Sequence, residues 1–366
     1  MRVVGFYKHL PIEDPQSLVD LHIEEPDLPT GYDLLVAVKA VSVNPVDTKI
    51  RKGLIPVENQ NFPHILGWDA SGKVIAVGPD CTLFSEGDEV YYAGTITRPG
   101  TNSQFHVVDE RIVGRKPKTL SFEEASAMPL TTITAWEALF DRLSLSEDIS
   151  KKTMASRLSN DSIINITKKK KHYLLIIGGA GGVGSITIQL AKQVAAASDS
   201  IAIIATASRN ESMEWCNKMG ADYIINHHDD IKKQLQQIVG IDYVDYILCL
   251  NDTDSYFNTM TQSVAPQGRI CSIVETKAPV NLGGLLRQKS AAFVWELMFT
   301  RSLYQTQDMI KQHHLLNLVA DLIDDKRIRT TLSEVLSPIN SQNLRKAHKK
   351  LESGRTIGKV VLSGFF

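Results

Sequence analysis

One glycine-rich segment restricts the fold of this chain more than any other feature of its sequence. The run Gly179-Ala180-Gly181-Gly182-Val183-Gly184 directly follows the apolar residues 174–177 and opens a helical stretch in which apolar residues recur at every fourth position. Glycines so placed allow a tight bend, a close approach of backbone amides to a pyrophosphate, and close packing of the helix on the strand. The amino terminus of the helix also attracts phosphate through its partial positive charge. The segment therefore predicts a dinucleotide-binding turn.

The residues after 173 alternate regularly between short apolar runs and helical patterns. We expect strands at 174–177, 201–206, 223–226, 244–250 and 269–274. Each run is nearly continuous in apolar residues, as in strands whose two faces are both covered by helices. This alternation is typical of an α/β fold with a doubly wound parallel sheet, the Rossmann architecture.

The end of the second of these strands indicates which dinucleotide binds. A site that prefers NAD has an Asp or Glu here, which binds the ribose hydroxyls. This chain has Thr206-Ala207-Ser208-Arg209 instead. The Ser208 hydroxyl can donate a hydrogen bond, and the Arg209 guanidinium can pair with a 2′-phosphate. The pattern favours NADPH, while the alternative that Arg209 is a surface residue and both cofactors bind stays open.

The first third of the chain is rich in short strands, and its end returns to helix and strand. We expect the early strands at 34–38, 72–78 and 88–92, because prolines and glycines between them leave little room for long helices. Residues typical of helices follow, and the chain closes on one more strand. These helices are expected at 123–128, 134–139, 307–323 and 341–353, and the strand at 359–362.

Composition disfavours several classes of partner. The 366 residues include 40 basic and 41 acidic side chains, so no broad electrostatic field favours nucleic acid or an anionic membrane. No apolar run reaches membrane-spanning length, and the amino terminus lacks the pattern of a secretory signal. We therefore expect a cytoplasmic protein that binds neither nucleic acid nor membrane. The polar segment 144–171 ends in lysines with no interleaved aromatic residues, which predicts a solvated surface loop.

The cysteines and paired histidines do not form a recognisable metal site. Cys81, Cys216, Cys249 and Cys271 are scattered, without the close pairs of structural zinc sites, and we expect neither a zinc cluster nor a disulfide. Cys249 and Cys271 lie in apolar runs, which predicts a place in the core. The histidine pairs at 227–228 and 313–314 are adjacent in the chain, so their side chains point in different directions and are not expected to share an ion.

A series of motifs along nearly the whole chain resembles a known superfamily. In chain order they are Val43-Asn44-Pro45-Val46-Asp47, Gly67-Trp68-Asp69, Gly87-Asp88-Glu89-Val90, residues 129–136, the glycine-rich turn, and Gly358-Lys359-Val360-Val361. The series resembles the medium-chain dehydrogenase/reductases, in particular quinone oxidoreductases and the related zinc-type alcohol dehydrogenase-like proteins. The resemblance implies a GroES-like catalytic domain at 1–132, a Rossmann NADPH-binding domain at 133–300, and a return to the catalytic domain at 301–366.

The resemblance also bears on metal binding. In the zinc-dependent alcohol dehydrogenases of this superfamily, a Cys and a His that bind the catalytic zinc occupy the positions of Asn44 and Trp68. Neither of these side chains can replace its counterpart on Zn²⁺, and Asp69 is expected to be a hydrogen-bonded structural carboxylate. We therefore expect a zinc-independent protein, with a zinc-dependent alcohol dehydrogenase of unusual ligands as an alternative.

Without a metal, a conjugated acceptor is easier to reduce than a simple ketone. The negative charge that arrives with hydride spreads to a remote oxygen in a quinone or an α,β-unsaturated carbonyl, where hydrogen-bond donors stabilise it. We therefore expect NADPH-dependent hydride transfer to a small-molecule quinone or enone. The alternative from another class is an NADPH-binding structural or RNA-binding protein with little catalysis.

By resemblance, the predicted site residues fall into two groups. Asn44 and Lys49 are the catalytic candidates, although Lys49 stands where many quinone oxidoreductases have a tyrosine, so it either orients ligands or is simply exposed. The cofactor candidates are Pro45, Thr131, Thr134, Gly179, Gly181, Gly182, Val183, Gly184, Ser208, Arg209, Asn226, Ile273 and Val274. A homodimer is expected through edge-to-edge pairing of the last Rossmann strand, 268–274.

Overall fold

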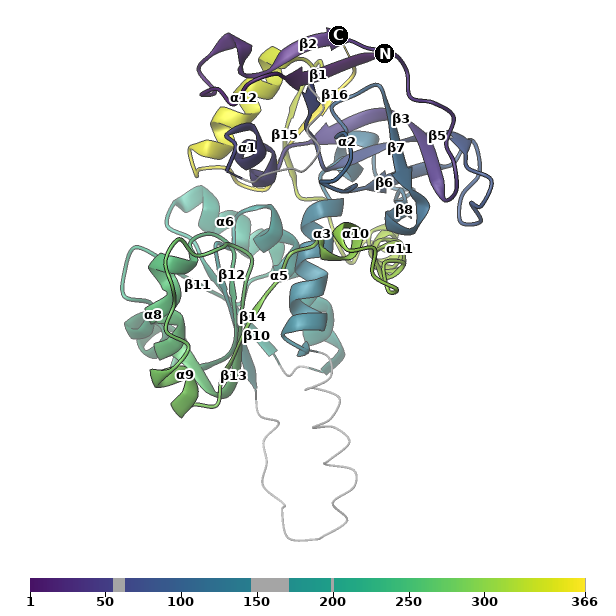
Figure 1. Cartoon of the computed structure of the whole chain (residues 1–366). Coiled ribbons are helices and arrows are strands. Elements are labelled where there is room, and N and C mark those ends of the chain that lie inside the picture. The colour runs from purple at the N-terminus through teal and green to yellow at the C-terminus, as the bar shows by residue number, and fades with distance from the viewer. Residues whose placement is uncertain (55–62, 146–170, 199–200, 366) are drawn as a thin grey trace, which may run out of the picture. The chain divides into compact units, whose positions relative to one another are not determined.

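The computed structural model describes residues 1–54, 63–145, 171–198 and 201–365, and for 196–198 only the backbone (Figure 1). The chain forms two compact units. Unit 1 comprises Met1–Ile133 and Met298–Phe366, and unit 2 comprises Thr134–Leu297. Most of the polar segment predicted to be a surface loop, residues 146–170, lies outside the described residues.

Unit 1 is built on a seven-stranded sheet in the order β15-β16-β3-β5-β6-β8, with β7 paired to β3. A three-stranded sheet in the order β2-β1-β4 lies beside the chain termini (Figure 1). The strands are β1 (Arg2–Phe6), β2 (Val19–His22), β3 (Asp33–Ser42), β4 (His64–Ile65), β5 (Ala70–Val77), β6 (Glu89–Tyr92), β7 (Phe105–Asp109), β8 (Val113–Arg115), β15 (Leu332–Leu336) and β16 (Lys359–Ser363).

Strand β3 is the centre of the larger sheet. It pairs antiparallel with β5, β7 and β16, and its Leu34, Val36 and Val41 are fully buried. The pairing of Val361 with Ser42 brings the last strand of the chain against the end of β3. The carboxy-terminal segment therefore completes the sheet that the amino-terminal residues begin.

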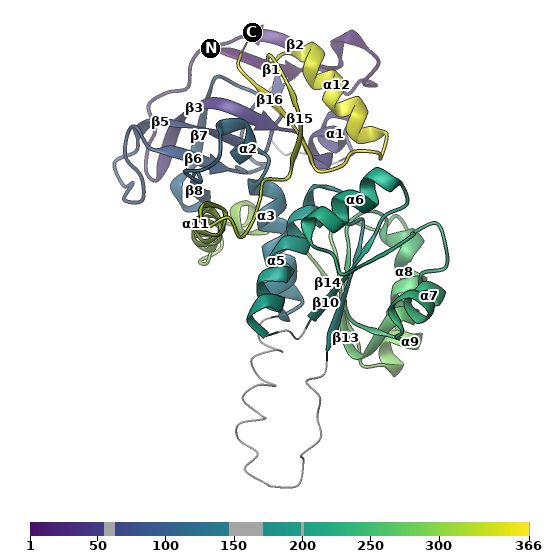
Figure 2. The same cartoon turned by 180° about the vertical axis from the view of Figure 1, so that it is seen from behind.

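Short helices connect the strands of unit 1. They are α1 (Pro45–Arg51), α2 (Phe122–Ser126), α3 (Pro129–Trp136), α10 (Thr300–Leu303), α11 (Lys311–Asp324) and α12 (Ser341–Glu352), with 3₁₀ turns η1 (Pro15–Ser17) and η2 (Glu110–Ile112). Helices α1 and α12 lie side by side in both views (Figure 2). The fully buried side chain of Arg51 in α1 donates to Glu352 at the end of α12 at 2.5 Å, which joins the two helices.

Unit 2 contains a six-stranded parallel sheet in the order β11-β10-β9-β12-β13-β14. Helix α5 contacts β9 and β10, whereas α8 contacts β12 and β13, and the two helices lie on opposite faces of the sheet (Figure 2). The strands are β9 (His172–Ile177), β10 (Ile201–Thr206), β11 (Tyr223–Ile225), β12 (Val244–Cys249), β13 (Val264–Ser272) and β14 (Ala292–Trp295). The helices are η3 (Glu137–Arg142), α5 (Gly182–Ser198), α6 (Asn210–Met219), α7 (Ile231–Gln234), η4 (Leu235–Val239), α8 (Thr253–Ser263) and α9 (Gly284–Gln288).

The predicted fold class, a β-rich domain plus a doubly wound parallel sheet, is confirmed. The apolar runs form the core of the sheet: Leu175, Ile247 and Ile270 are fully buried, and so are Cys249 and Cys271, as expected. Among the described residues, no helix is long and apolar enough to cross a bilayer.

The prediction that residues 268–274 form the last strand of the parallel sheet is wrong. Strand β14, which was not expected, pairs in parallel with β13, so that Ser272 lies opposite Trp295. Strand β13 therefore lies inside the sheet, between β12 and β14, and its backbone groups already have partners on both sides. Residues 268–274 cannot pair edge to edge with a second chain. The run that forms β14 is only four residues long, too short to stand out by periodicity.

Candidate functional site

The glycine-rich turn and the loops with the other cofactor candidates of the parallel sheet lie at the carboxyl ends of its strands. The strands end in register, since Ala205 of β10 pairs with Ile176 of β9, and Ser272 of β13 pairs with Cys249 of β12. The chain order of the strands reverses between β9 and β12. Ligands of open α/β sheets bind at the carboxyl ends of the strands, next to such a reversal. The loops after β9, β10, β11 and β13 thus meet where a dinucleotide is expected.

Hydrogen bonds to β10 fix the glycine-rich turn. The Gly179 N–H donates to the Thr206 carbonyl at 3.1 Å, and the Gly178 N–H donates to the Thr206 hydroxyl oxygen at 3.0 Å. A Cβ on Gly184 would lie 2.5 Å from the carbonyl oxygens of Gly178 and Gly179, so only glycine fits there. A Cβ on Gly181 would meet nothing nearer than 3.8 Å, so that side of the turn is open to a phosphate.

Gly182 and Val183 are the first residues of α5, a helix of 17 residues. The N–H groups in the first turn of a helix have no acceptor within the helix, and the helix dipole adds partial positive charge at this end. The turn and the start of α5 together fit a pyrophosphate group.

The loop after β10 carries Ser208 and Arg209 next to Asn226. The Ala207 N–H donates to the last residue of β11 at 3.0 Å, which continues the pairing of the two strands past the end of β10. The Arg209 N–H donates to the Ser212 hydroxyl at 3.1 Å, and that hydroxyl donates to the Arg209 carbonyl at 2.7 Å. Ser208, Arg209 and Asn226 are all half-buried. The polar residues predicted for the adenosine end therefore lie on neighbouring loops.

Ile273 and Val274 follow β13 and do not belong to it, because the strand ends at Ser272. The Ile273 N–H donates to the Cys249 carbonyl at 3.2 Å, and the Val274 carbonyl accepts from the Thr253 hydroxyl. The hydroxyl oxygens of Thr253 and Ser272 are 2.5 Å apart. Sequence reasoning missed Thr253, although a polar residue that starts a helix after a buried strand was an available signal.

A second group of predicted residues surrounds a buried ion pair in unit 1. The Lys359 ammonium lies 3.0 Å from Asp69 Oδ2, and the two side chains are 4% and 0% exposed. Asn44 bridges the pair, since its Nδ2 donates to Asp69 Oδ2 at 2.9 Å and its Oδ1 accepts from Lys359. The third donor of the ammonium has the Val43 carbonyl as its acceptor, at 2.9 Å. We call Asn44, Asp69 and Lys359 the buried cluster. Its members Asp69 and Lys359 were not among the predicted site residues.

The buried cluster orders the start of two helices. The Leu130 N–H at the start of α3 donates to Asp69 Oδ1 at 2.8 Å. The Asn44 N–H, just before α1, donates to Asp47 Oδ2 at 2.6 Å. Burial raises the pKa of Asp47 to about 7, and the hydrogen bond from Asn44 and the nearby Lys359 ammonium oppose this only in part.

These helices carry the catalytic candidate Lys49 and three of the cofactor candidates, Pro45, Thr131 and Thr134. Pro45 is exposed at the first position of α1, and Lys49 is half-buried one turn later. Thr131 is buried in α3, where its hydroxyl donates to the Met128 carbonyl at 3.1 Å. Thr134, also buried in α3, belongs to unit 2. Within unit 1 the structure thus gathers Asn44, Pro45, Lys49 and Thr131 on segments that meet the buried cluster.

Comparison with known proteins identifies the family of the chain. The model of the alcohol dehydrogenase GroES-like domain matches residues 30–123, and the zinc-binding dehydrogenase model matches residues 219–362. A zinc-type alcohol dehydrogenase-like protein of Staphylococcus aureus is 39% identical over 363 residues, which cover 99% of this chain and 100% of that protein. The chain belongs to the medium-chain dehydrogenase/reductase superfamily.

Solved structures of medium-chain dehydrogenase/reductases share the fold over nearly the whole length. A crystal structure of a putative zinc-dependent alcohol dehydrogenase protein from Rhizobium etli is 45% identical, with a TM-score of 0.87, and the match covers 100% of this chain and 98% of that one. The Escherichia coli quinone oxidoreductase complexed with NADPH is 25% identical, with a TM-score of 0.77, and the match covers 99% and 100% of the two chains. The predicted superfamily is confirmed, and the chain is an oxidoreductase of that superfamily.

The residues in the zinc-ligand positions of this medium-chain dehydrogenase/reductase do not fit a zinc ion. Trp68 is 1% exposed, and its indole N–H donates to the Thr95 carbonyl at 3.0 Å. Asn44 and Lys359 both donate to the Oδ2 atom of Asp69, and the ammonium charge repels a cation from that carboxylate. Among the residues that the structure describes, no group of three or more His, Cys, Asp or Glu side chains could hold a metal ion.

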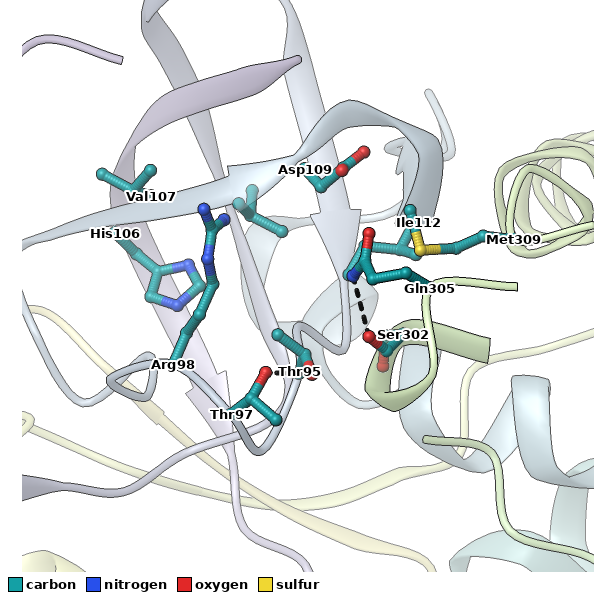
Figure 3. Close-up of a pocket in the computed structure, with 11 residues that line it drawn as sticks. Thr95, Thr97, Arg98, His106, Val107, Asp109, Ile112, Ser302, Gln305 and Met309 are labelled. Carbon is teal, nitrogen blue, oxygen red and sulfur yellow. Dashed lines mark hydrogen bonds between the residues drawn. The ribbon is translucent and has the colours of Figure 1, made fainter. Parts of the chain in front are cut away.

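A cavity of about 240 Å³ lies in unit 1, away from the predicted residues (Figure 3). Its Arg98 is held by Asp33, with two hydrogen bonds of 2.8 and 2.7 Å. Burial lowers the pKa of its His106 to about 4, and the ring stacks on Tyr92, so His106 is neutral at physiological pH. Thr95, which accepts from Trp68, also lines the cavity. Sequence reasoning did not indicate this cavity, because its lining residues come from segments far apart in the chain.

Proposed function

We propose that the chain is a zinc-independent, NADPH-dependent oxidoreductase that transfers hydride to small-molecule quinones or α,β-unsaturated carbonyls. The observation that carries the proposal is the ion pair of Lys359 with Asp69, which replaces metal ligation by a saturated network of hydrogen bonds. The proposal for the cofactor rests on the glycine-rich turn and on Ser208 and Arg209 at the end of β10.

In this proposal the residues of unit 2 bind and orient NADPH, which supplies the hydride. The amides of the turn and the start of α5 bind the pyrophosphate, with Gly181 on the open side. Ser208 and Arg209 bind the 2′-phosphate through charge-assisted hydrogen bonds. Ile273 and Val274 flank the nicotinamide, and their loop is fixed by the hydroxyl of Thr253.

The buried cluster has a positioning role in this proposal. Every donor of the Lys359 ammonium is engaged. The Asn44 Nδ2 donates to Asp69 Oδ2 and, at 3.4 Å, to the Ser42 carbonyl. Neither residue has a proton to give to an acceptor molecule. They fix the starts of α1 and α3, on which Pro45, Lys49 and Thr131 lie. Precise placement of such elements lowers the entropic cost of hydride transfer.

The chemistry of the acceptor follows from the replacement of the zinc ligands by Asn44 and Trp68. A simple ketone develops its negative charge on one oxygen, which zinc would stabilise. A conjugated acceptor spreads that charge, so hydrogen-bond donors or water are sufficient. The similarity of this chain to the Escherichia coli quinone oxidoreductase complexed with NADPH supports this class of acceptor.

Oxidation of NADPH by a panel of acceptors tests the proposal. We expect turnover with quinones and enals, little with simple ketones, and no loss on treatment with a chelator. Stoichiometric zinc together with chelator-sensitive oxidation of alcohols would instead identify a zinc-dependent alcohol dehydrogenase. Tight NADPH binding without turnover of any acceptor would favour the structural or RNA-binding class.

A further inference from the structure

Two buried hydroxyl groups lie under the loop that carries Ile273 and Val274. Ser272 is the last residue of β13 and is fully buried, whereas Thr253 is the first residue of α8 and is 1% exposed. The two hydroxyl oxygens are 2.5 Å apart, although the residues are 19 positions apart in the chain. Ser272 pairs with Cys249 at the end of β12, and α8 begins shortly after that strand. The register of the two strands therefore brings the hydroxyls together.

Each hydroxyl has only one proton, and this fixes the direction of the hydrogen bonds. The Val274 carbonyl can only accept, so the Thr253 hydroxyl donates to it. The Thr253 oxygen then accepts from the Ser272 hydroxyl. The Val274 N–H in turn donates to the Ser272 oxygen, at 3.5 Å. The three bonds run from the N–H of Val274 through both hydroxyls to its own carbonyl, and we call this closed set of Thr253, Ser272 and Val274 the hydroxyl ring.

Two further hydrogen bonds fix the rest of this loop. The Ile273 N–H donates to the Cys249 carbonyl at 3.2 Å. The Lys277 N–H donates to Oδ2 of Asp254, the residue after Thr253, at 2.9 Å. The loop is therefore tied to the end of β12 and to the first turn of α8, and all of these contacts lie within unit 2.

We propose that Thr253 and Ser272 are positioning residues for hydride transfer, because the hydroxyl ring fixes Val274 beside the nicotinamide. This rests on the proposed function, in which Ile273 and Val274 flank the nicotinamide. Both peptide groups of Val274 are engaged, so its half-buried apolar side chain is left to contact the cofactor. The two hydroxyls act through Val274, since they are buried and bonded to each other. The hydroxyl ring therefore controls the rate of hydride transfer more than the affinity for NADPH.

Single-turnover oxidation of NADPH by a naphthoquinone measures the transfer step apart from binding and product release. Thr253→Val removes the hydroxyl, keeps the branched shape of the side chain, and opens the hydroxyl ring. Because a misplacement of about 1 Å can slow a reaction about a hundredfold, we expect transfer roughly ten- to a hundredfold slower than in wild type. The affinity for NADPH, measured by the fluorescence of the bound cofactor, should hardly change. Thr253→Ser keeps the hydroxyl and should restore most of the rate.

Two further variants separate the hydroxyl ring from general effects on the helix. Ser272→Ala opens the ring at its other hydroxyl and should slow transfer by a similar factor. Combined with Thr253→Val it should be little slower than either change alone, because the same ring is lost only once. The matched control is Thr261→Val. Thr261 is buried in the same helix, and its hydroxyl donates to the Asn258 carbonyl within that helix at 2.8 Å, so this variant should keep the rate of the wild type.

The positioning role would be overturned by wild-type rates in Thr253→Val and Ser272→Ala. An equal loss of rate in Thr261→Val, or a loss of NADPH affinity that accounts for the slower transfer, would overturn it as well. If Thr253→Val does not fold, the rate and NADPH affinity of Ser272→Ala decide in the same way. A wild-type protein that binds NADPH but reduces no acceptor would instead overturn the proposed function, which is a distinguishable result.

Discussion

The Lys359 ammonium lies 3.0 Å from the Asp69 carboxylate, and this ion pair is closed off from solvent inside unit 1. The two residues come from opposite ends of the chain, 290 positions apart. Asn44 completes their hydrogen bonding, and together the three side chains anchor the starts of α1 and α3. The stability of this arrangement depends on keeping all three partners.

Substitution of Lys359 by methionine should destabilise the protein strongly. Removal of one partner leaves the Asp69 charge buried without its counter-ion, which typically costs about 3–5 kcal/mol. Urea unfolding should therefore show a large drop in the free energy of unfolding, and Asp69→Asn should recover part of it in the Lys359→Met background. The matched control is Lys350→Met, because Lys350 forms an exposed ion pair with Glu334 that is worth roughly 0–1 kcal/mol. Equal losses for the two lysines would contradict the structural role of Lys359.

Acidification should destabilise unit 1 through His348. This side chain of α12 is fully buried, and burial, with the charges of Arg51 and Lys52, lowers its pKa to about 3. A folded-state pKa below the unfolded value of about 6.5 means that the unfolded state binds the extra proton between these values. The stabilisation is complete above about pH 6.5 and is lost as the pH falls toward about 3.

Chemical denaturation between about pH 7 and about pH 4 measures this loss. The free energy of unfolding should fall with pH more steeply in the wild type than in His348→Leu. His314→Leu, at an exposed position in α11, provides the control and should keep the slope of the wild type. Identical slopes in wild type and His348→Leu would show that His348 does not limit acid stability.

Substitution of Arg209 by alanine should weaken NADPH binding selectively. A charged hydrogen bond to phosphate contributes about 1.5–3 kcal/mol, which corresponds to a loss of roughly ten- to a hundredfold in affinity. NADH has no phosphate at this position, so its affinity should hardly change. Fluorescence titration of both cofactors measures the two losses. Equal losses would mean that Arg209 supports the loop before α6 and does not bind the phosphate.

We expect a homodimer in which the β14 strands of two chains pair at the edge of the parallel sheet in unit 2. Among the described residues, no strand pairs with β14 on the side away from β13, and the side chains of Trp295 and Leu297 are exposed. An open apolar edge of this kind favours pairing with a second copy. We expect Trp295→Glu to shift light scattering from the dimer mass to the monomer mass, whereas Leu318→Glu, at an exposed position in α11, should not. A wild-type monomer at micromolar concentration would remove the basis for this expectation.

Much of unit 2 could be predicted from the sequence, because its signals are local. The bend at Gly184, the apolar runs of the strands, and the polar residues after β10 each depend on a few neighbouring positions. The one strand that was missed, β14, has a run too short to show a period, and its place was decided by pairing with β13.

The buried cluster of unit 1 could be recognised only from the tertiary structure. Sequence alone determined that the zinc ligands of related dehydrogenases are replaced at Asn44 and Trp68. It could not show that Lys359, 315 residues after Asn44, fills the same site with a positive charge. Only the pairing of β16 with β3 brings these residues together. Local propensity and turn chemistry act over a few residues, whereas the register between strands distant in the chain is set by the packing of the whole fold.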